Sequence, residues 1–488
     1  MADLDGRSCH PGAFIAALRR GAPSGAGFTL DRASIAGLAG WGVHSLVDSF
    51  LDKPAIPLHA FLLAALVLSI RDRVSHRPST RRTLALTLIC IALAAATLWI
   101  NWGFAAFSHA RAAAYREDWG AAREWMETAV ARDPANRYYR RDRALAYGHL
   151  ACEEAAWLEP AITAYEDHLR RFDAWAPDHA NLAALLAEAG EYDRAITAIE
   201  TARRLDPAEP VYTCLLGRYL EADGRLDEAM DAFSTCLAHA PRLTSASFWQ
   251  ETPWRAATMP QILQRAIRRA VEEGNLLEEA RLLATAGDPA GARSAVETYR
   301  QRYPDDPTAA VVEAQVLLQT GDQAQARDRL EALVERNPAV REAWLLLGRI
   351  YLESGEVQRA AEAAATARAL HADEHSKLLE GRVAEAQGDV ESALSSYRWV
   401  IDTALYTPVS SFAPWVAHRL PLEGEWLPCV RPPRPYEFLA EPALALGRML
   451  EERGRCEEAV ELYRRVIQQE PALEEVQERL DRMRCPPP

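Results

Sequence analysis

Small and hydrophobic residues recur with a period near 34 from about residue 108 to the end of the chain. In each period an apolar stretch at helical spacing leads to a Gly, and a second stretch leads toward a Pro, as in "LLGRYLEADGRLDEAMDAFSTCLAHAP". This pattern predicts two antiparallel helices per period. We therefore expect an all-α chain in which about nine helical hairpins stack into an α-solenoid over residues 108–484.

The best-preserved period, "REAWLLLGRIYLESGEVQRAAEAAATA", resembles the tetratricopeptide repeat (TPR), whose pattern is W-x2-L-G-x2-Y followed by A-x3-F and P. Small residues at two of these positions let the paired helices approach closely, and the larger apolar positions fill the space between hairpins. The residues expected to pack the repeats in this way are Gly217, Ala229, Phe233, Trp344, Gly348, Tyr351, Ala360, Gly447, Ala459 and Tyr463. Residues 472–484 are expected to form a terminal capping helix with a polar outer face.

Two Pro-rich stretches interrupt the period, at residues 242–260 and 405–438. We expect both to be loops that project from the array, because dense Pro is incompatible with helix interiors. Their tryptophans are candidates for partner binding: Trp249, Trp254, Trp415 and Trp426. The other interpretation, which we prefer because buried aromatics are commoner, is that these side chains hold the loops on the repeat surface.

The N-terminal part has a different pattern. After a short segment, 1–32, expected to be cytoplasmic, residues 33–107 hold three apolar stretches that are candidate membrane spans: 33–49, 54–70 and 83–107. No Asp, Glu, Lys or Arg lies between Arg82 and Arg111, a run long enough to cross a bilayer. We expect a permanent, multi-pass anchor in the cytoplasmic membrane.

Charge predicts the orientation of this anchor. The loop "RDRVSHRPSTRR", residues 71–82, carries five arginines and one acid, so the positive-inside rule places it in the cytoplasm. The last span then leads outward, and the TPR domain is expected to be extracytoplasmic. Residues 1–107 carry ten basic and six acidic residues, a net charge of +4. Because the whole chain has a net charge of −14, the remainder carries −18. Such an acidic domain argues against nucleic acid as a partner.

The sequence holds no enzyme motif in its repeats: it has no phosphate-binding Gly loop with Lys and Ser/Thr, no H-E-x-x-H and no C-x-x-C. The stretch "HADEH", residues 371–375, contains possible metal ligands, but it falls at a turn between repeats and a solvated turn is the preferred interpretation. We expect no metal and no cofactor. Cys214 and Cys236 fall on the two helices of one hairpin, where either a disulfide or a buried free thiol would fit.

His44 and Asp48 form an i, i+4 pair near the outer membrane boundary, where they either act in function or satisfy each other. The surrounding "GVHSLVDSFLDKPAIPLHAFLLAALVL" resembles the closing transmembrane segments of the bacterial O-antigen ligase/polymerase family, over residues 33–70. This resemblance implies membrane chemistry on lipid-linked glycans, but the family's many upstream spans and external loop do not precede it here. His44 and Asp48 therefore receive no catalytic role.

Two functions are compatible with these patterns. The first is a membrane-anchored TPR scaffold that binds proteins through the groove of its repeats, outside the cytoplasm, in assembly of the cell envelope or of surface polysaccharide. The second is the C-terminal part, or a split subunit, of an O-antigen ligase/polymerase-type glycosyl-transfer enzyme, for which a lipid-linked glycan would be a further partner. We expect the chain not to be catalytic by itself.

Overall fold

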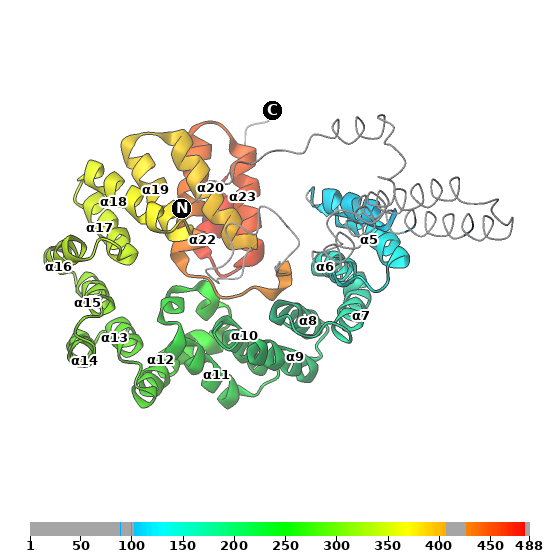
Figure 1. Ribbon diagram of the computed structural model, residues 1–488, viewed down its shortest axis with the longest axis horizontal. Coiled ribbons are helices and arrows are strands. Elements are labelled where there is room, and N and C mark those ends of the chain that lie inside the picture. The colour runs from blue at the N-terminus through cyan, green and yellow to red at the C-terminus, as the bar shows by residue number, and fades with distance from the viewer. Residues whose placement is uncertain (1–87, 89–98, 100–101, 115, 407–425, 484–488) are drawn as a thin grey trace, which may run out of the picture. The chain divides into compact units, whose positions relative to one another are not determined.

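The computed structural model describes residues 88, 99, 102–114, 116–406 and 426–483 of the chain (Figure 1). The N-terminal segment and the candidate spans 33–49 and 54–70 lie outside these residues, as does most of the candidate span 83–107. Residues 102–114 are helical. Among the described helices, none is both long enough and apolar enough to cross a membrane.

The described part is all helical, with no strand, as the period predicted. The α-helices are α5 (Trp119–Arg132), α6 (Arg137–Glu153), α7 (Leu158–Leu169), α8 (Ala176–Glu188), α9 (Tyr192–Leu205), α10 (Val211–Ala222), α11 (Leu226–His239), α12 (Pro253–Glu273), α13 (Leu276–Thr285), α14 (Pro289–Arg302), α15 (Thr308–Gln319), α16 (Gln323–Arg336), α17 (Arg341–Glu353), α18 (Val357–Leu370), α19 (Glu374–Gln387), α20 (Val390–Tyr406), α22 (Tyr436–Glu452), α23 (Cys456–Gln469) and α24 (Glu474–Arg482). Short 3-10 helices are η1 (Ala155–Trp157), η2 (Pro241–Ser245), η3 (Ser247–Gln250) and η4 (Pro428–Val430).

Consecutive helices pack as hairpins: α6 with α7, α8 with α9, α10 with α11, α13 with α14, α15 with α16, α17 with α18, α19 with α20, and α22 with α23. Most of the turns hold a Gly with positive φ. Gly224, which follows α10, has φ 80°, a conformation that Gly adopts without strain. It lets the Arg225 N–H donate to the Leu220 carbonyl at 2.9 Å, and this hydrogen bond ends the helix.

Three glycines of the repeats each lie against a large side chain. A Cβ at Gly217 would lie 2.5 Å from the ring of Phe233, and one at Gly348 would lie 2.5 Å from a methyl of Leu379. The ring of Tyr463 covers Gly447 in the same way. Ala229, Ala360 and Ala459 are completely buried on the second helices of their pairs. Close approach of neighbouring helices, within a pair at Gly217 and Gly447 and between pairs at Gly348, therefore depends on the missing side-chain volume at these positions.

The first insertion, predicted as a loop over residues 242–260, differs from that prediction. Its first part forms η2 and η3, but from Pro253 onward it is the start of α12, a helix of 21 residues. Pro253 lies at the beginning of the helix, where its missing N–H costs nothing, and Thr252 caps the helix by accepting from the Arg255 N–H at 3.1 Å. Pro260 remains inside α12, so density of Pro alone was the wrong criterion for a loop.

The second insertion is also shorter than the predicted 405–438. Residues 405 and 406 end α20, and Tyr436 begins α22. Residues 407–425 lie outside the described part of the chain. What the structure describes of this insertion is residues 426–435, called here the docked segment. The terminal helix α24 buries only Val476, as expected of a polar cap.

Contacts divide the chain into two units, residues 1–108 with 128–134, and residues 109–127 with 135–488. In the first unit the Arg132 guanidinium lies 4.0 Å from the centre of the Trp99 ring, and the Trp99 indole N–H donates to the Arg132 carbonyl at 2.9 Å. The repeats from α6 onward, with all the residues of the candidate site, belong to the second unit.

Candidate functional site

The docked segment precedes α22 in sequence but lies against the first helices of three early pairs, α6, α8 and α10. Figure 1 shows it in orange, with η4 beside α8. The Leu427 N–H donates to the Asn181 side-chain oxygen at 2.9 Å. The Leu427 side chain covers Gly148, where a Cβ would lie 2.5 Å from a Leu427 methyl. The absence of a side chain at position 148 is therefore what lets Leu427 seat on α6.

Aromatic stacking holds the beginning of the docked segment. The Trp426 ring stacks on Tyr212 of α10, with ring centres 5.8 Å apart, and Trp426 is only 5% exposed. Burial raises the pKa of Tyr212 far above its ordinary value. Tyr212 is therefore a neutral stacking partner at every physiological pH.

Arg218 of α10 binds the backbone of the docked segment. Its guanidinium donates to the Val430 carbonyl at 3.0 Å and to the Arg431 carbonyl at 2.6 Å. The same guanidinium is held by both oxygens of Glu251, at 2.7 and 2.9 Å. Glu251 in turn pairs with the buried Arg255 at 2.9 Å. This network of charges thus fixes Arg218 in position for the segment.

A disulfide joins the docked segment to α6. Cys429 is bonded to Cys152, 277 residues earlier, with Cα atoms 5.5 Å apart. A second disulfide joins Cys214 to Cys236 within one hairpin, which settles the alternative that the sequence left open in favour of the bridge. The first bridge therefore ties the docked segment to a repeat that lies far from it in the sequence.

At its other end the docked segment contacts the last repeat. Arg434 is 4% exposed and its guanidinium lies 3.9 Å from Glu470, the residue that follows α23 and is 3% exposed. Ser247 of η3 donates a hydrogen bond to the same carboxyl. Burial raises the pKa of Glu470 to about 7, because Arg434 and Ser247 only partly offset the loss of water. Glu470 is the point where α23, η3 and the docked segment meet.

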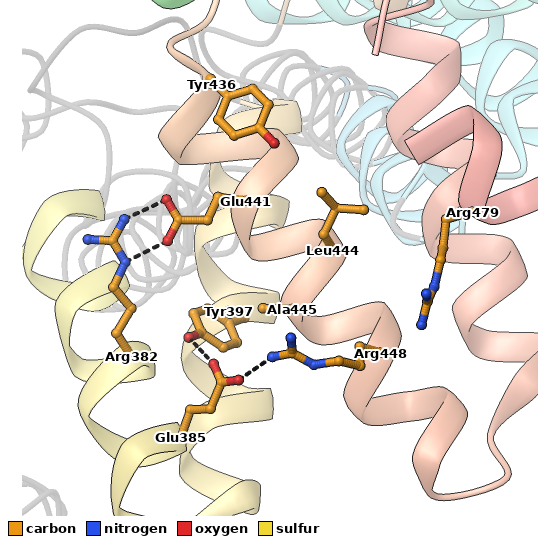
Figure 2. A pocket seen from close by; sticks show the side chains of 9 residues that line it. All are labelled: Arg382, Glu385, Tyr397, Tyr436, Glu441, Leu444, Ala445, Arg448 and Arg479. Atoms are coloured by element: carbon orange, nitrogen blue, oxygen red, sulfur yellow. Dashed lines mark hydrogen bonds and ion pairs between the residues drawn. The ribbon is translucent and has the colours of Figure 1, made fainter. Parts of the chain in front are cut away.

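The last repeats form an open pocket of about 390 Å³ between α19, α22 and α24 (Figure 2). Its lining is Arg382, Glu385, Tyr397, Tyr436, Glu441, Leu444, Ala445, Arg448 and Arg479. Figure 2 shows two ion pairs across it: Arg382 donates to both oxygens of Glu441, at 2.6 and 2.5 Å, and Arg448 donates to Glu385. Tyr397 donates to Glu385 at 2.7 Å. The pocket therefore presents guanidinium groups, carboxylates and tyrosine rings to a ligand.

The predicted tryptophans lie in different places. Trp249 is 1% exposed, packs edge-on against Phe233 and Phe248, and donates to the Leu243 carbonyl at 2.6 Å. Trp254 is half-buried at the start of α12. Trp249 and Trp426 are thus both buried against the repeats, the interpretation that the sequence analysis preferred. Trp415 lies outside the described residues, as do His44 and Asp48.

The "HADEH" stretch is a turn and a helix start. Asp373 caps α19 by accepting from the Ser376 N–H at 3.0 Å, and it pairs with Arg341 of the preceding repeat. The Asp373 pKa lies far below its ordinary value: burial raises it, but His375, Ser376 and Arg341 lower it more. The described residues include no group of three His, Cys, Asp or Glu that could hold a metal ion.

These helical hairpins define an α-solenoid, and family models identify its repeats. Two tetratricopeptide repeat models match, one over residues 181–242, 277–328 and 311–375, the other over residues 443–477. The chain therefore contains tetratricopeptide repeats, as the sequence predicted. No curated protein matches the chain.

Several solved structures are similar to parts of the chain. One is a tetratricopeptide repeat protein from Parabacteroides merdae, 17% identical, covering 58% of this chain and 99% of its own, with a TM-score of 0.27. Another is a thermophilic TPR protein of Thermus thermophilus, 20% identical, covering 43% of this chain and 97% of its own, with a TM-score of 0.31. The Cut9–Hcn1 hetero-tetramer of APC/C is 13% identical, covering 78% and 89%, with a TM-score of 0.33. The repeat assignment rests on the family models and the helix pairs, because TM-scores this low define no shared arrangement.

The resemblance of residues 33–70 to the O-antigen ligase/polymerase family is not supported by these comparisons, since the family models that match cover repeats alone.

The place where the docked segment binds is what the sequence did not reveal. For "WLPCVRPPRPY" the sequence predicts a loop, with contact of its tryptophan with the repeat surface as the preferred interpretation, but it does not predict which repeats the loop contacts. The sequence did contain an indication that this segment is buried: if it projected into solvent, three large apolar residues and a Cys would all be exposed. The partners of those residues are more than 200 positions away, however, and a repeat pattern does not reveal contacts at that separation.

We expect Glu470 to make stability depend on pH. The folded state holds the Glu470 proton more tightly than the unfolded state, so the contribution of this residue to the free energy of unfolding is greatest below pH 4.5 and falls as the pH rises toward about 7. The groups that face the carboxyl are Arg434, Ser247, Glu251 and Arg218. The loss should amount to about 3 kcal/mol at most, at about 1.4 kcal/mol per pKa unit.

The measurement is the urea midpoint of the wild type and of Glu470→Gln between pH 4.5 and 7.5. The wild type should lose stability relative to the variant across this range. As a control, Glu461→Gln changes an exposed carboxylate on α23, and its urea midpoint should change with pH in the same way as that of the wild type. Parallel curves for the wild type and Glu470→Gln would contradict the burial argument.

Proposed function

We propose that this protein is a membrane-anchored TPR scaffold that binds a protein partner outside the cytoplasm, in assembly of the cell envelope or of surface polysaccharide. TPR arrays bind protein segments on the surfaces that their helix pairs present, and the fold by itself supplies no catalytic chemistry. The observation that carries the proposal is the pocket between α19, α22 and α24, which is open and lined by charged and tyrosine side chains (Figure 2).

The chemistry of the pocket favours an acidic and aromatic segment of a partner. Arg448 is half exposed, so its guanidinium can exchange Glu385 for a partner carboxylate at little cost, because exposed ion pairs contribute about 0–1 kcal/mol. Arg479 lies on the terminal helix and is held by Glu451 at 3.1 Å. Tyr436 and Leu444 add apolar surface between these cations. A carboxylate beside an aromatic side chain would satisfy both features.

The extracytoplasmic location rests on two independent supports. Cys152–Cys429 and Cys214–Cys236 are disulfides, and disulfides persist in oxidising compartments. The five arginines of residues 71–82, followed by the uncharged stretch 83–110, orient the anchor with the repeats outward.

Photo-crosslinking in intact cells tests the binding site. A photoreactive residue at Leu444 should yield a discrete protein adduct, whereas one at Glu200, exposed on α9, should not. Arg448→Glu should reduce the Leu444 adduct at least tenfold by repelling an acidic segment. The matched control Arg464→Glu reverses an exposed charge on α23 and should leave the adduct unchanged. An adduct that survives Arg448→Glu would refute this site.

Location is tested by topology. A phosphatase reporter fused after Pro488 should be active, because the arginine loop retains residues 71–82 in the cytoplasm. Changing those five arginines to Gln should scramble the orientation and lower the reporter activity. The same change at Arg140, Arg141 and Arg143, in the repeats, serves as a control that should leave orientation intact. An inactive reporter in the unaltered chain would contradict the extracytoplasmic assignment.

A further inference from the structure

The docked segment has the character of a bound peptide. It contains one short 3-10 helix, η4, and otherwise no regular structure, and its residues from Pro432 to Pro435 are buried although they belong to no repeat. The surface beneath it, called here the docking surface, consists of Gly148 and Cys152 of α6, Asn181 of α8, and Tyr212 and Arg218 of α10. These helices are the first helices of three consecutive pairs. The segment therefore crosses the same face of each repeat in turn.

Side chains of the docking surface bind the backbone of the docked segment. Asn181, 1% exposed, accepts from the Leu427 N–H and donates to the Tyr165 hydroxyl at 3.1 Å, which fixes the orientation of its amide. Arg218, fixed by Glu251, donates to two successive carbonyls, those of Val430 and Arg431. Side chains that bind peptide N–H and C=O groups recognise any segment of suitable backbone geometry.

The docking surface also selects side chains. Tyr212 stacks on Trp426, Gly148 leaves room for Leu427, and Val430 is completely buried. The Pro residues that follow restrict the backbone in advance, so that less conformational entropy is lost on docking. The ligand chemistry of this surface is therefore an extended peptide with an aromatic and a leucine side by side, followed by a Pro-rich stretch.

We propose that the docking surface is a peptide-binding site distinct from the pocket, that the chain occupies it in cis with residues 426–435, and that the Cys152–Cys429 disulfide keeps it occupied. A tethered ligand meets its site at an effective concentration of about millimolar or more, and a covalent bond prevents its departure. A free peptide of the same chemistry binds only when the disulfide is absent, and it binds more tightly when the other contacts of the segment are also weakened. The docked segment is thus an autoinhibitory ligand.

The first test measures binding of a labelled peptide with the sequence of residues 426–436 and Cys429→Ser, by fluorescence anisotropy on the purified full-length chain. The wild type should bind at least tenfold more weakly than the triple variant Trp426→Ala/Leu427→Ala/Cys429→Ser. A peptide methylated on the Leu427 nitrogen cannot donate to Asn181, and its affinity for the triple variant should fall at least tenfold. Equal binding by wild type and triple variant, or by both peptides, would overturn the proposal.

A second test does not depend on the triple variant being folded. In the single variant Cys429→Ser, Cys152 carries a free thiol and the other contacts of the segment remain. The peptide is supplied with its own Cys429 as a mixed disulfide with glutathione; attack by the Cys152 thiolate forms a Cys152–peptide disulfide and releases glutathione as the thiol. Mass spectrometry should find the peptide on Cys152, with the methylated peptide at least tenfold slower. Equal rates for the two peptides would show chemical trapping without a site and would overturn the proposal.

Discussion

The docking of residues 426–435 on α6, α8 and α10 is the interaction on which the arrangement of the second unit depends. In a TPR array each repeat contacts only its neighbours in the sequence, so the stability of the array is a sum of local contributions. The repeat pattern itself provides no contact between distant hairpins. Here Leu427 binds Asn181 from 246 residues away, and Ser247 binds Glu470 from 223 residues away. Closing such long loops costs conformational entropy, and the Cys152–Cys429 disulfide removes part of that cost from the folding equilibrium in advance.

Buried charge is the second physical constraint. Arg255 is 1% exposed and pairs with Glu221 at 2.7 Å and Glu251 at 2.9 Å, and Glu251 also holds Arg218. Ionised groups this deeply buried are tolerated because each has a partner of opposite charge with direct hydrogen bonds. Glu470 lies at the edge of the network: burial raises its pKa, and the ion pair with Arg434, at 3.9 Å, only partly offsets that effect. The surface under the docked segment is covered by buried contacts. The pocket of the last repeats, in contrast, is open to solvent.

Sequence reasoning identified what is local. The Gly at each hairpin turn recurs once per period, and Gly217 and Phe233, which are in contact, lie within the same period. Such positions predict where each helix begins and ends. Its prediction of a loop over α12 was wrong, because Pro253 fits the start of a helix and Pro260 is tolerated inside this one. It left the state of Cys214 open because a thiol and a disulfide fit the same hairpin. It missed Cys152–Cys429, since any pairing among eight cysteines is compatible with the spacing. It preferred the interpretation in which Trp426 holds its insertion on the repeat surface, but it could not identify Tyr212 as the partner, because the docking contacts join residues far apart in the sequence.

The most direct measurement is disulfide mapping of the intact protein, digested without reduction and analysed by mass spectrometry. Docking of residues 426–435 on α6 predicts a linked pair of peptides that contain Cys152 and Cys429, separate from a linked pair that contains Cys214 and Cys236. The first pair is the decisive one, because only a segment docked on α6 brings Cys429 within bonding distance of Cys152. Recovery of Cys152 and Cys429 as free thiols, or joined to other cysteines, in a sample where Cys214 and Cys236 are linked would contradict the account.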